Sequence, residues 1–423
     1  MRGTGDAATL AAESGISKDL AEQMRGELKY WYPVDLRVSA KDLIQNHLTM
    51  FLYNHAAIWP DNKEMWPRSI YCNGHILVDG EKMSKSAGNF IMLREAIQTY
   101  SADCTRLACA DAGDSMDDAN FVRKTANEMI MKLTTLVDNI KDIKEKAPEM
   151  RTGDFNTFDK IFENAINNAI AKTDNNYQRM AFRMAMATAY YELTSEQSQY
   201  KIASGSSGMH ATLALRYAEA ITKMMMPLAP HITEHIWTEV LGNKGSLMNE
   251  AFPEPSAPVD FGLLMASRLI QDTCHEMRTQ AQKLAKKRGP MEEVHVYVAP
   301  KYLEWQQNGL EALKKIYDAN DSTFPADFKK QIMAAKEPWL TANKNMPEVM
   351  GFIDFSRLNC EKYGSDALQI EPSCDDMKVL QDTLEFISTS TNIPKVVLHT
   401  NDDESVEGHA VARGKSRPGE PSI

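Results

Sequence analysis

The chain has 423 residues, 43% of them hydrophobic and 25% charged, an ordinary composition for a soluble protein of two or three domains. No apolar run is long enough to span a bilayer, the first residues lack the apolar centre of a signal peptide, and we expect no membrane association. The net charge of −11 argues against a protein that coats nucleic acid non-specifically, although it leaves room for a local basic surface. The six cysteines form no C-x-x-C pair, so we expect reduced thiols and a cytoplasmic location.

The first hundred residues alternate between strand and helix signals. Residues 1–29 predict a partly irregular lead-in that ends in a short helix. The aromatic and β-branched run "YWYPVDLRVS" predicts a strand, and the next twenty or so residues have apolar side chains at helical spacing, with Ser39 and Asp42 as a capping box. "RSIYCNGHILVDG" predicts a strand, an Asn-Gly turn and a second strand, and residues 93–100 predict a helix. This order is typical of an α/β layer over residues 30–100.

The rest of the chain changes character twice. Residues 101–250 are long amphipathic runs separated by Gly and Pro, which predicts a helical bundle whose first helix begins at a Ser101 cap. A stretch rich in Pro, Gly and Ser then marks a boundary. Residues 259–423 mix strands such as "EEVHVYVAP" and "PKVVLHT" with helices such as "LEWQQNGLEALKKIYDA", which predicts a small α+β domain.

One short segment, "HILVDGEKMSKSAGN", carries the strongest chemical signal. Lys82 and Lys85 lie three residues apart among hydroxyl side chains, between Gly80 and Gly88. The glycines allow the backbone to move and to approach a ligand closely, while the lysines supply point charges for phosphate oxygens. A bare K-x-x-K is typical of a solvated loop, but the string K-M-S-K-S arises by chance in roughly one of a few thousand chains of this composition.

This string resembles the second signature of class I aminoacyl-tRNA synthetases. The segments "YWYPVDLRVSAKDLIQNHL", "NGHILVDGEKMSKSAGNF" and "RLACADAGDSMDDANF" are similar to the eukaryotic and archaeal type of leucyl-tRNA synthetase, and "MMMPLAPHITEHIW" is similar to the last helix of the anticodon bundle in that branch. The resemblance is close from about residue 30 to 120 and becomes thin beyond residue 260. It implies part of a Rossmann-type catalytic region, then an α-helical anticodon-binding bundle and a C-terminal α+β domain that contacts tRNA.

The resemblance also implies roles for individual residues. Lys82 and Lys85 match the lysines that hold the phosphates of ATP, and the other members of the loop are Met83, Ser84 and Ser86. Asp42 becomes a candidate for the ribose hydroxyls, a role suited to a carboxylate acceptor, or alternatively a helix cap. His75 is a second candidate for nucleotide contact, while its alternative is an ordinary strand residue. Asn89 is expected to cap the helix that follows. Ala40 departs from the glycine of relatives, and its methyl group could crowd the nucleotide.

The implied reaction is the ATP-dependent attachment of leucine to leucine tRNA, with Mg²⁺ accompanying ATP. No metal ligand set is identifiable in the sequence. The earlier His-x-Gly-His signature of the family is absent, and the amino-acid pocket lies upstream of the matched region in relatives. We therefore expect the chain alone to be inactive or nearly so. A multisynthetase assembly or an N-terminal-half partner remains open.

Two other functions compete with this one. "HITEH" fits the His-x-x-Glu-His pattern of one metalloprotease group, with His231 and His235 as zinc ligands and Glu234 as the base. A non-catalytic tRNA-binding or regulatory module is the other alternative. The stretch "QAQKLAKKRG" offers it Lys283, Lys286, Lys287 and Arg288, unless these side chains form only a solvated basic turn.

Overall fold

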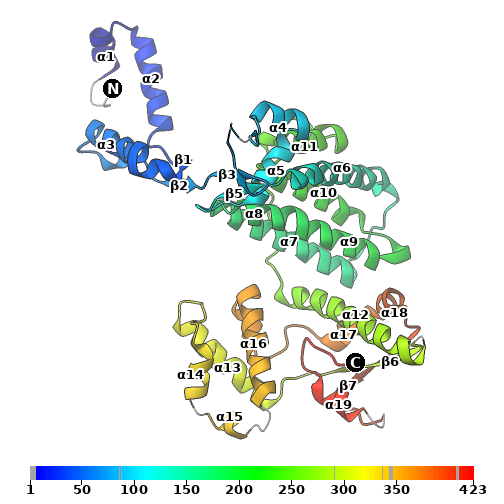
Figure 1. Ribbon diagram of the computed structural model, residues 1–423. Helices are drawn as coiled ribbons and strands as arrows, with labels where there is room; N and C mark the ends of the chain where they lie inside the picture. The colour runs from blue at the N-terminus through cyan, green and yellow to red at the C-terminus, as the bar shows by residue number, and fades with distance from the viewer. Residues whose placement is uncertain are drawn as a thin grey trace. The chain divides into compact units, whose positions relative to one another are not determined.

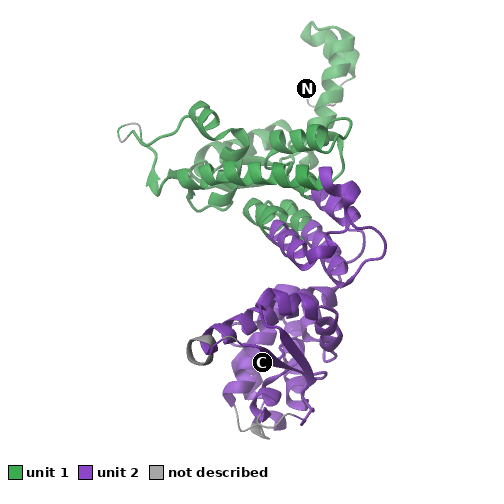
Figure 2. Ribbon diagram, turned by 90° about the vertical axis from the view of Figure 1, so that its right-hand side faces the viewer, with its two compact units in different colours: residues 1–144, 172–191, 221–252 green, residues 145–171, 192–220, 253–423 purple. Residues whose placement is uncertain are grey.

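The computed structural model describes residues 6–84, 86, 88–289, 291–335, 337–342, 346–405 and 409–423, with only the backbone given for 285–288 and 341–342 (Figure 1). The chain divides into two compact units (Figure 2). Unit 1 comprises residues 1–144, 172–191 and 221–252, and unit 2 comprises residues 145–171, 192–220 and 253–423. No helix in the described part of the chain is long and apolar enough to cross a membrane.

Unit 1 begins with two helices, α1 (Ala7–Ser14) and α2 (Lys18–Trp31). Asp6 and Ser17 cap them by accepting hydrogen bonds from the backbone N–H groups of the first turns. The predicted strand over residues 30–39 is wrong in its first part, because α2 continues through Trp31. Tyr32 is extended, as expected of a residue that precedes proline, and the strand begins only at Arg37.

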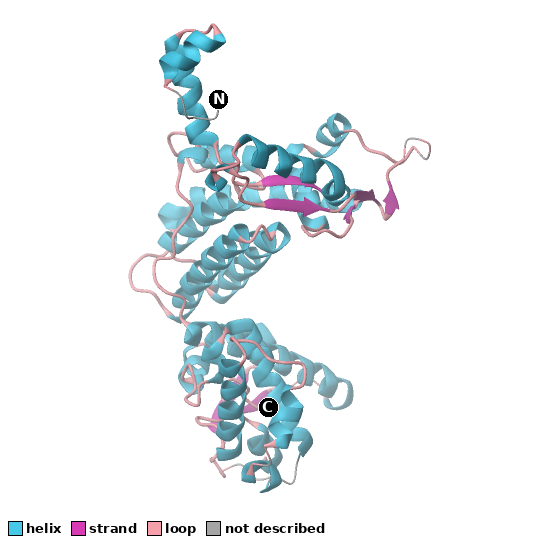
Figure 3. Cartoon of the chain, turned by 90° about the vertical axis from the view of Figure 1, so that its left-hand side faces the viewer, coloured by secondary structure: helices cyan, strands magenta, loops and turns pink. Residues whose placement is uncertain are grey.

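Unit 1 contains two small sheets (magenta strands in Figure 3). Strands β1 (Arg37–Ala40) and β2 (Ile70–Asn73) pair in parallel. Strands β3 (Ile76–Val78), β4 (Glu81–Lys82) and β5 (Ala119–Phe121) form the second sheet in the order β4-β3-β5, with β3 and β5 parallel. The connection from β1 to β2 holds η1 (Lys41–Leu43), the π-helical η2 (Ile44–Leu48), α3 (Thr49–Ile58) and η3 (Lys63–Met65).

The predicted hairpin at Asn73-Gly74 is wrong, because β2 and β3 belong to different sheets. The glycine is needed for another reason. A Cβ atom on Gly74 would lie 2.1 Å from the carbonyl oxygen of Asp117, so only glycine lets the two backbones pass this closely.

The middle of the chain is helical as predicted, apart from strand β5 at residues 119–121. Unit 1 holds α4 (Leu93–Tyr100), α5 (Ala102–Ala112), most of α6 (Arg123–Lys146), α8 (Phe182–Met186), α11 (Pro230–His235), η7 (Ile236–Val240) and η8 (Leu247–Asn249). The buried side chains of α6 recur every three or four residues, as expected of an amphipathic helix: Ala126, Met129, Leu133, Leu136, Ile140 and Ile143. Ser101 caps α5 as predicted, by accepting from the N–H of Cys104.

The remaining bundle elements are η4 (Ala147–Glu149), α7 (Thr157–Gln178), η5 (Ala187–Glu192), α9 (Leu193–Ala203), η6 (Gly205–Ser207) and α10 (Ala211–Met225). The end of the chain, within unit 2, holds α12 (Phe261–Arg288), β6 (Glu293–Val298), α13 (Glu304–Ala319), α14 (Phe328–Ala334), α15 (Pro338–Ala342), α16 (Met346–Tyr363), η9 (Ser365–Leu368), α17 (Asp376–Asp382), α18 (Leu384–Thr391), β7 (Lys395–Thr400) and α19 (Ala410–Lys415).

Strands β6 and β7 pair in parallel, and the strand predictions for both segments are confirmed. Val294, Val296 and Val298 alternate into a core that also contains Leu269 of α12 and Ile387 of α18. A second apolar core lies among α13, α14 and α16. The mixed strand and helix pattern predicted for this part of the chain therefore matches the structure.

Candidate functional site

The lysine loop follows a tight turn between β3 and β4. Asp79 and Gly80 form this turn with φ values of 49° and 87°. The backbone N–H of Gly80 donates to Oδ1 of Asn120 at 2.7 Å, and the N–H of Arg123 donates to Oδ1 of Asp79 at 3.0 Å. The turn is thus tied to β5 and to the first residue of α6.

Asn89 closes the other end of the loop. Its Oδ1 accepts from the N–H of Ser84 at 2.9 Å, and its Nδ2 donates to the carbonyl oxygen of Lys82 at 3.1 Å. The prediction that Asn89 caps the next helix is wrong, because α4 begins at Leu93 and Met92 occupies its cap position without a side-chain bond. Asn89 instead binds the backbone of Ser84 and of Lys82, which holds the two arms of the loop together.

The structure places four of the five predicted loop members. Lys82 and Ser86 are exposed, and Met83 and Ser84 are half-buried. The hydroxyl groups of Ser84 and Ser86 are 2.7 Å apart and form a hydrogen bond. Lys85 lies outside the described residues. The loop therefore presents hydroxyl groups and at least one ammonium group to solvent, as phosphate binding requires.

Asp118 organises a polar cluster at the start of β3. Its Oδ1 accepts from Nζ of Lys41 at 2.7 Å and from the N–H of His75 at 3.0 Å, with Nδ1 of His75 at 3.4 Å. The hydrogen bond from Lys41, followed by that from the backbone of His75, lowers the pKa of Asp118 to about 2. Nε2 of His75 lies 3.9 Å from Oδ2 of Asp42, so the structure brings together the two nucleotide candidates that are 33 residues apart in the chain.

Asp42 is exposed and does not belong to a capping box. Ser39 lies in β1, paired with Cys72, and Ala40 occupies the cap position of η1 without a side-chain hydrogen bond. The capping-box prediction is therefore wrong, because the sheet retains Ser39. The carboxylate of Asp42, with 58% of its side chain exposed, remains accessible to a ligand.

The direction of β4 relates the loop to this cluster. Lys82 pairs with Leu77 and Glu81 with Val78, so β4 runs back along β3 towards His75. The chain after Lys82 therefore leaves the sheet at the end of β3 where His75, Asp118 and Asp42 meet. Sequence reasoning did not single out Lys41 or Asp118. The adjacent Lys41-Asp42 and Asp117-Asp118 pairs were visible signals, but only the fold shows that they meet.

Two residues of the proposed zinc motif, His231 and Glu234, have other partners. Nδ1 of His231 lies 2.8 Å from Oδ1 of Asp103, and Oδ2 of Asp103 accepts from the N–H of Ile232 at 2.7 Å. Glu234 accepts from the N–H of Leu247 at 2.9 Å. Within the described part of the chain, no group of three or more His, Cys, Asp or Glu side chains could hold a metal ion. The geometry does not support the metalloprotease function.

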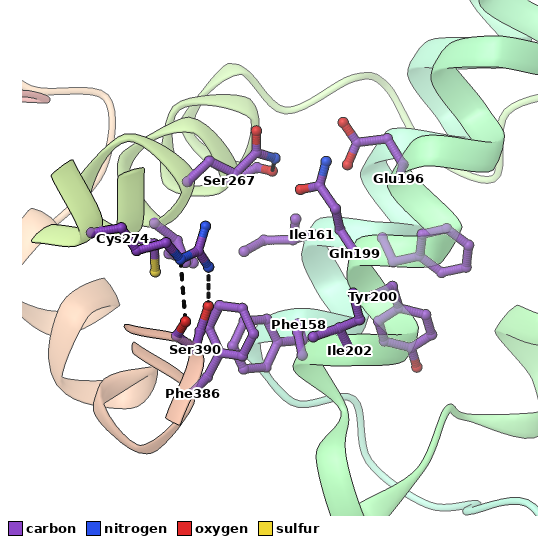
Figure 4. Close-up of a pocket in the computed structure, with 15 residues that line it drawn as sticks. Phe158, Ile161, Glu196, Gln199, Tyr200, Ile202, Ser267, Cys274, Phe386 and Ser390 are labelled. Atoms are coloured by element: carbon purple, nitrogen blue, oxygen red, sulfur yellow. Dashed lines mark hydrogen bonds between the residues drawn. The ribbon is translucent and has the colours of Figure 1, made fainter. Parts of the chain in front are cut away.

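Unit 2 contains a cavity of about 340 Å³ lined by α7, α9, α12 and α18 (Figure 4). Its lining is mostly apolar and includes Phe158, Ile161, Ile202 and Phe386. Arg278, at its edge, donates to the backbone oxygen and to the hydroxyl group of Ser390. Its lining includes none of the predicted site residues.

Two family models match the chain. The model described as "tRNA synthetases class I (M)" matches residues 17–146, which include the lysine loop and the Asp118 cluster. The model described as "Anticodon-binding domain of tRNA ligase" matches residues 159–296. The cytoplasmic leucine–tRNA ligase of Pongo abelii is 37% identical over 90% of this chain and 33% of its own length. The chain is homologous to leucine–tRNA ligases.

Other leucine–tRNA ligases agree with this assignment. The cytoplasmic enzyme of Arabidopsis thaliana is 35% identical over 97% of this chain and 39% of its own length, and that of Aeropyrum pernix is 31% identical over 100% of this chain and 41% of its own length. The chain thus spans between a third and two fifths of these leucine–tRNA ligases. A solved ternary complex of an Agrobacterium radiobacter LeuRS with tRNA and LeuAMS covers 53% of this chain and 29% of that chain, with 19% identity and a TM-score of 0.47.

Proposed function

We propose that this chain acts as part of a leucine–tRNA ligase, with the loop from Lys82 to Ser86 binding the phosphates of ATP. The observation that carries the proposal is the arrangement at β3. The antiparallel β4 directs the lysine loop to the end of β3 where His75 and Asp42 lie. The side chains proposed to bind phosphate and those proposed to bind ribose would then lie at one site, so a single nucleotide could contact both.

In the proposed reaction, the carboxylate of leucine attacks the α-phosphorus of ATP and pyrophosphate leaves. Lys82 and Lys85 neutralise the charge that develops on the leaving group. The exposed carboxylate of Asp42 accepts hydrogen bonds from the ribose hydroxyls, with His75 beside it. The acyl group then passes to the terminal ribose of leucine tRNA. Mg²⁺ would accompany ATP through its phosphates.

The Lys41–Asp118 pair supports the same site indirectly. Lys41 binds Asp118, and the backbone N–H of His75 donates to the same oxygen atom. This arrangement fixes the start of β3 and neutralises a carboxylate that would otherwise repel phosphate. The cytoplasmic location is extended to this protein from the named cytoplasmic relatives and belongs to the proposal.

The test is leucine-dependent ATP–pyrophosphate exchange. The chain is assayed alone and as a replacement for the matching segment of a relative leucine–tRNA ligase. In the replacement enzyme, Lys82→Ala should lower the exchange rate about 100-fold, the loss expected when one preorganised charge is removed. Lys29→Ala is the matched control, because Lys29 is an exposed lysine of α2 and should leave the rate unchanged.

An unchanged exchange rate in the Lys82→Ala enzyme would refute the role of the loop. Robust leucine-dependent exchange by the chain alone would refute the expectation that it is inactive by itself.

A non-catalytic tRNA-binding module is the second candidate, and the anticodon-binding match over residues 159–296 fits it and the ligase equally. Lys283 of α12 is exposed, while the side chains of Lys286, Lys287 and Arg288 lie outside the described residues. Filter binding of this chain to leucine tRNA should show affinity that falls steeply with salt. Lack of binding at low salt would exclude this function for the chain.

A further inference from the structure

One face of the β6–β7 pair carries two histidines and a tyrosine, and it lies outside every site described above. The valines of β6 point into the core, and Val396 and Leu398 of β7 pack on the same core. Side chains alternate along a strand, so His295, Tyr297 and His399 share the opposite face with Val397, the register partner of His295. The register places His399 next to Tyr297, and the rings of His295 and His399 are stacked with centroids 5.1 Å apart.

These side chains form one continuous row of hydrogen bonds and ion-pair contacts. Nδ1 of His399 lies 2.7 Å from Oδ2 of Asp403, and its Nε2 lies 2.8 Å from Nδ1 of His295. Nε2 of His295 lies 3.5 Å from Oε1 of Glu293, which also binds Nζ of Lys395 at 2.8 Å. The row therefore links both strands to the turn that follows β7.

A second contact joins this face to α19. The hydroxyl group of Tyr297 lies 2.7 Å from Nδ1 of His409, the residue that precedes α19, and the rings of His295 and His409 are 5.1 Å apart. Arg413 of α19 donates to the carbonyl oxygen of Asp403 at 3.0 Å. The charged and titratable groups described around His295 are thus Glu293, Tyr297, Lys395, His399, Asp403, His409 and Arg413.

The hydrogen bond between Nδ1 of His295 and Nε2 of His399 contains a single proton. Asp403 is acceptor-only when ionised, so the proton on Nδ1 of His399 points to it and Nε2 of His399 must accept from Nδ1–H of His295. His295 can take up a proton on Nε2, facing Glu293, without losing this bond. A further proton would have to enter between the two rings, where two N–H groups would face each other across 2.8 Å, so the bond must break.

We propose that His295 and His399 form a proton-operated latch that holds the turn at residues 401–405 and the start of α19 against the β6–β7 sheet. At neutral pH the latch is closed. As the medium becomes acidic, protonation of both rings separates β6 from the turn, and the histidine face becomes accessible to solvent. Burial, followed by the neighbouring His399 and His409, lowers the pKa of His295 below its ordinary value, and Glu293 opposes the shift.

The direction of the pH effect follows from this shift. A group whose pKa is lower in the folded than in the unfolded chain stabilises the fold above its ordinary pKa, here 6.5. That stabilisation is lost as pH falls below this value towards the folded-state pKa. Asp403, whose pKa is lowered by its bonds to Ser405 and His399, behaves in the same way but in a much more acidic range. The contributions of His295 and Asp403 to stability are therefore lost in different pH ranges and can be measured separately.

The test is hydrogen–deuterium exchange of the full chain at pH 7.5 and 5.5, corrected for the intrinsic pH dependence of exchange. Protection of residues 395–405 and 409–415 should fall severalfold at the lower pH, because protonation of both rings breaks the bond between them. In His295→Asn this fall should disappear, because an amide can offer its N–H to neutral His399 or its oxygen to protonated His399. The control His275→Gln changes an exposed histidine of α12 and should behave like the original chain.

Equal pH dependence in His295→Asn and the original chain, or no fall in the original chain, would overturn the latch. NMR titration of the histidine Cε1–H signals tests the original chain without mutation. The His295 signal is expected to titrate below the ordinary value of 6.5. Titration of His295 at or above this value would also overturn the proposal.

Discussion

Asp159 is the residue whose removal should most damage the bundle segments of unit 2. It is fully buried, and it accepts hydrogen bonds from Arg151 at 2.6 Å, from the hydroxyl group of Tyr200 and from the N–H of Asn156 at 2.8 Å. Its own N–H donates to Oδ1 of Asn156 at 2.9 Å, so the two residues cap α7 reciprocally. Tyr200 also accepts from the N–H of His210 at 2.8 Å, which links the start of α10 to the same carboxylate.

The cost of Asp159→Ala follows from the groups it leaves behind. Removing one member of a buried ion pair costs about 3–5 kcal/mol, and each unpaired buried polar group costs about 1–3 kcal/mol. Arg151 keeps 21% of its side chain exposed and regains some hydration, which reduces the total. We expect a loss of about 4 kcal/mol, or roughly 1,000-fold in the protection of α7 against hydrogen exchange.

The assay is hydrogen exchange of residues 150–165, because a chain of two units does not unfold in one step and one melting temperature would mix the units. Asp154→Ala is the matched control, since Asp154 is an exposed carboxylate of the same loop. Tyr200→Phe should cost about 2 kcal/mol, because the N–H of His210 loses its acceptor. A change below about 1 kcal/mol in Asp159→Ala would refute the reasoning.

Acid should weaken the same site. Burial opposes the ionisation of Asp159, but hydrogen bonds from Arg151, Tyr200 and Asn156 together outweigh it and lower its pKa below 3.8. The stabilisation is therefore present above about pH 4 and is lost as pH falls below this value. The protection of α7 in the Asp159→Ala chain should be nearly independent of pH in that range, and a dependence as steep as that of the original chain would contradict this assignment.

Two further changes test the neighbourhood of the lysine loop. Asn89→Ala removes the bonds to Ser84 and Lys82, so limited trypsin digestion should cut the chain after Lys82 several times faster. The control Asn62→Ala, at an exposed position before η3, should not change the rate of cleavage. Equal cleavage rates in both variants would contradict the role of Asn89. Gly74→Ala should destabilise unit 1 by about 3 kcal/mol, because its Cβ atom would overlap the carbonyl of Asp117. The control Gly26→Ala, in α2 with no atom close to its Cβ, should stabilise unit 1 by about 0.5–1 kcal/mol. Urea unfolding, monitored by hydrogen exchange in β3, measures both free energies, and an unchanged stability in Gly74→Ala would show that the close approach is dispensable.

Prediction from sequence succeeded where the signal is local. Residues 93–100 were predicted as a helix and form α4, and Ser101 was predicted as a cap and accepts from Cys104. Both depend on side-chain spacing and on hydrogen bonds within one turn. Prediction failed at Asn73-Gly74, where turn chemistry is the usual reason for the dipeptide but close packing against Asp117 is the actual one.

The site shows the same division. The sequence predicted a phosphate-binding loop, because two lysines among hydroxyl residues and glycines suit phosphate oxygens, and it predicted the helical character of the middle of the chain through its apolar periodicity. Only the tertiary structure decided that Lys41 and His75 share Asp118, that β4 returns the chain after Lys82 to this cluster, and that His231 contacts Asp103. The contacts of Asp118 and of Asp103 join residues 43 to 128 positions apart, and they depend on strand order and helix packing rather than on any local preference of the chain.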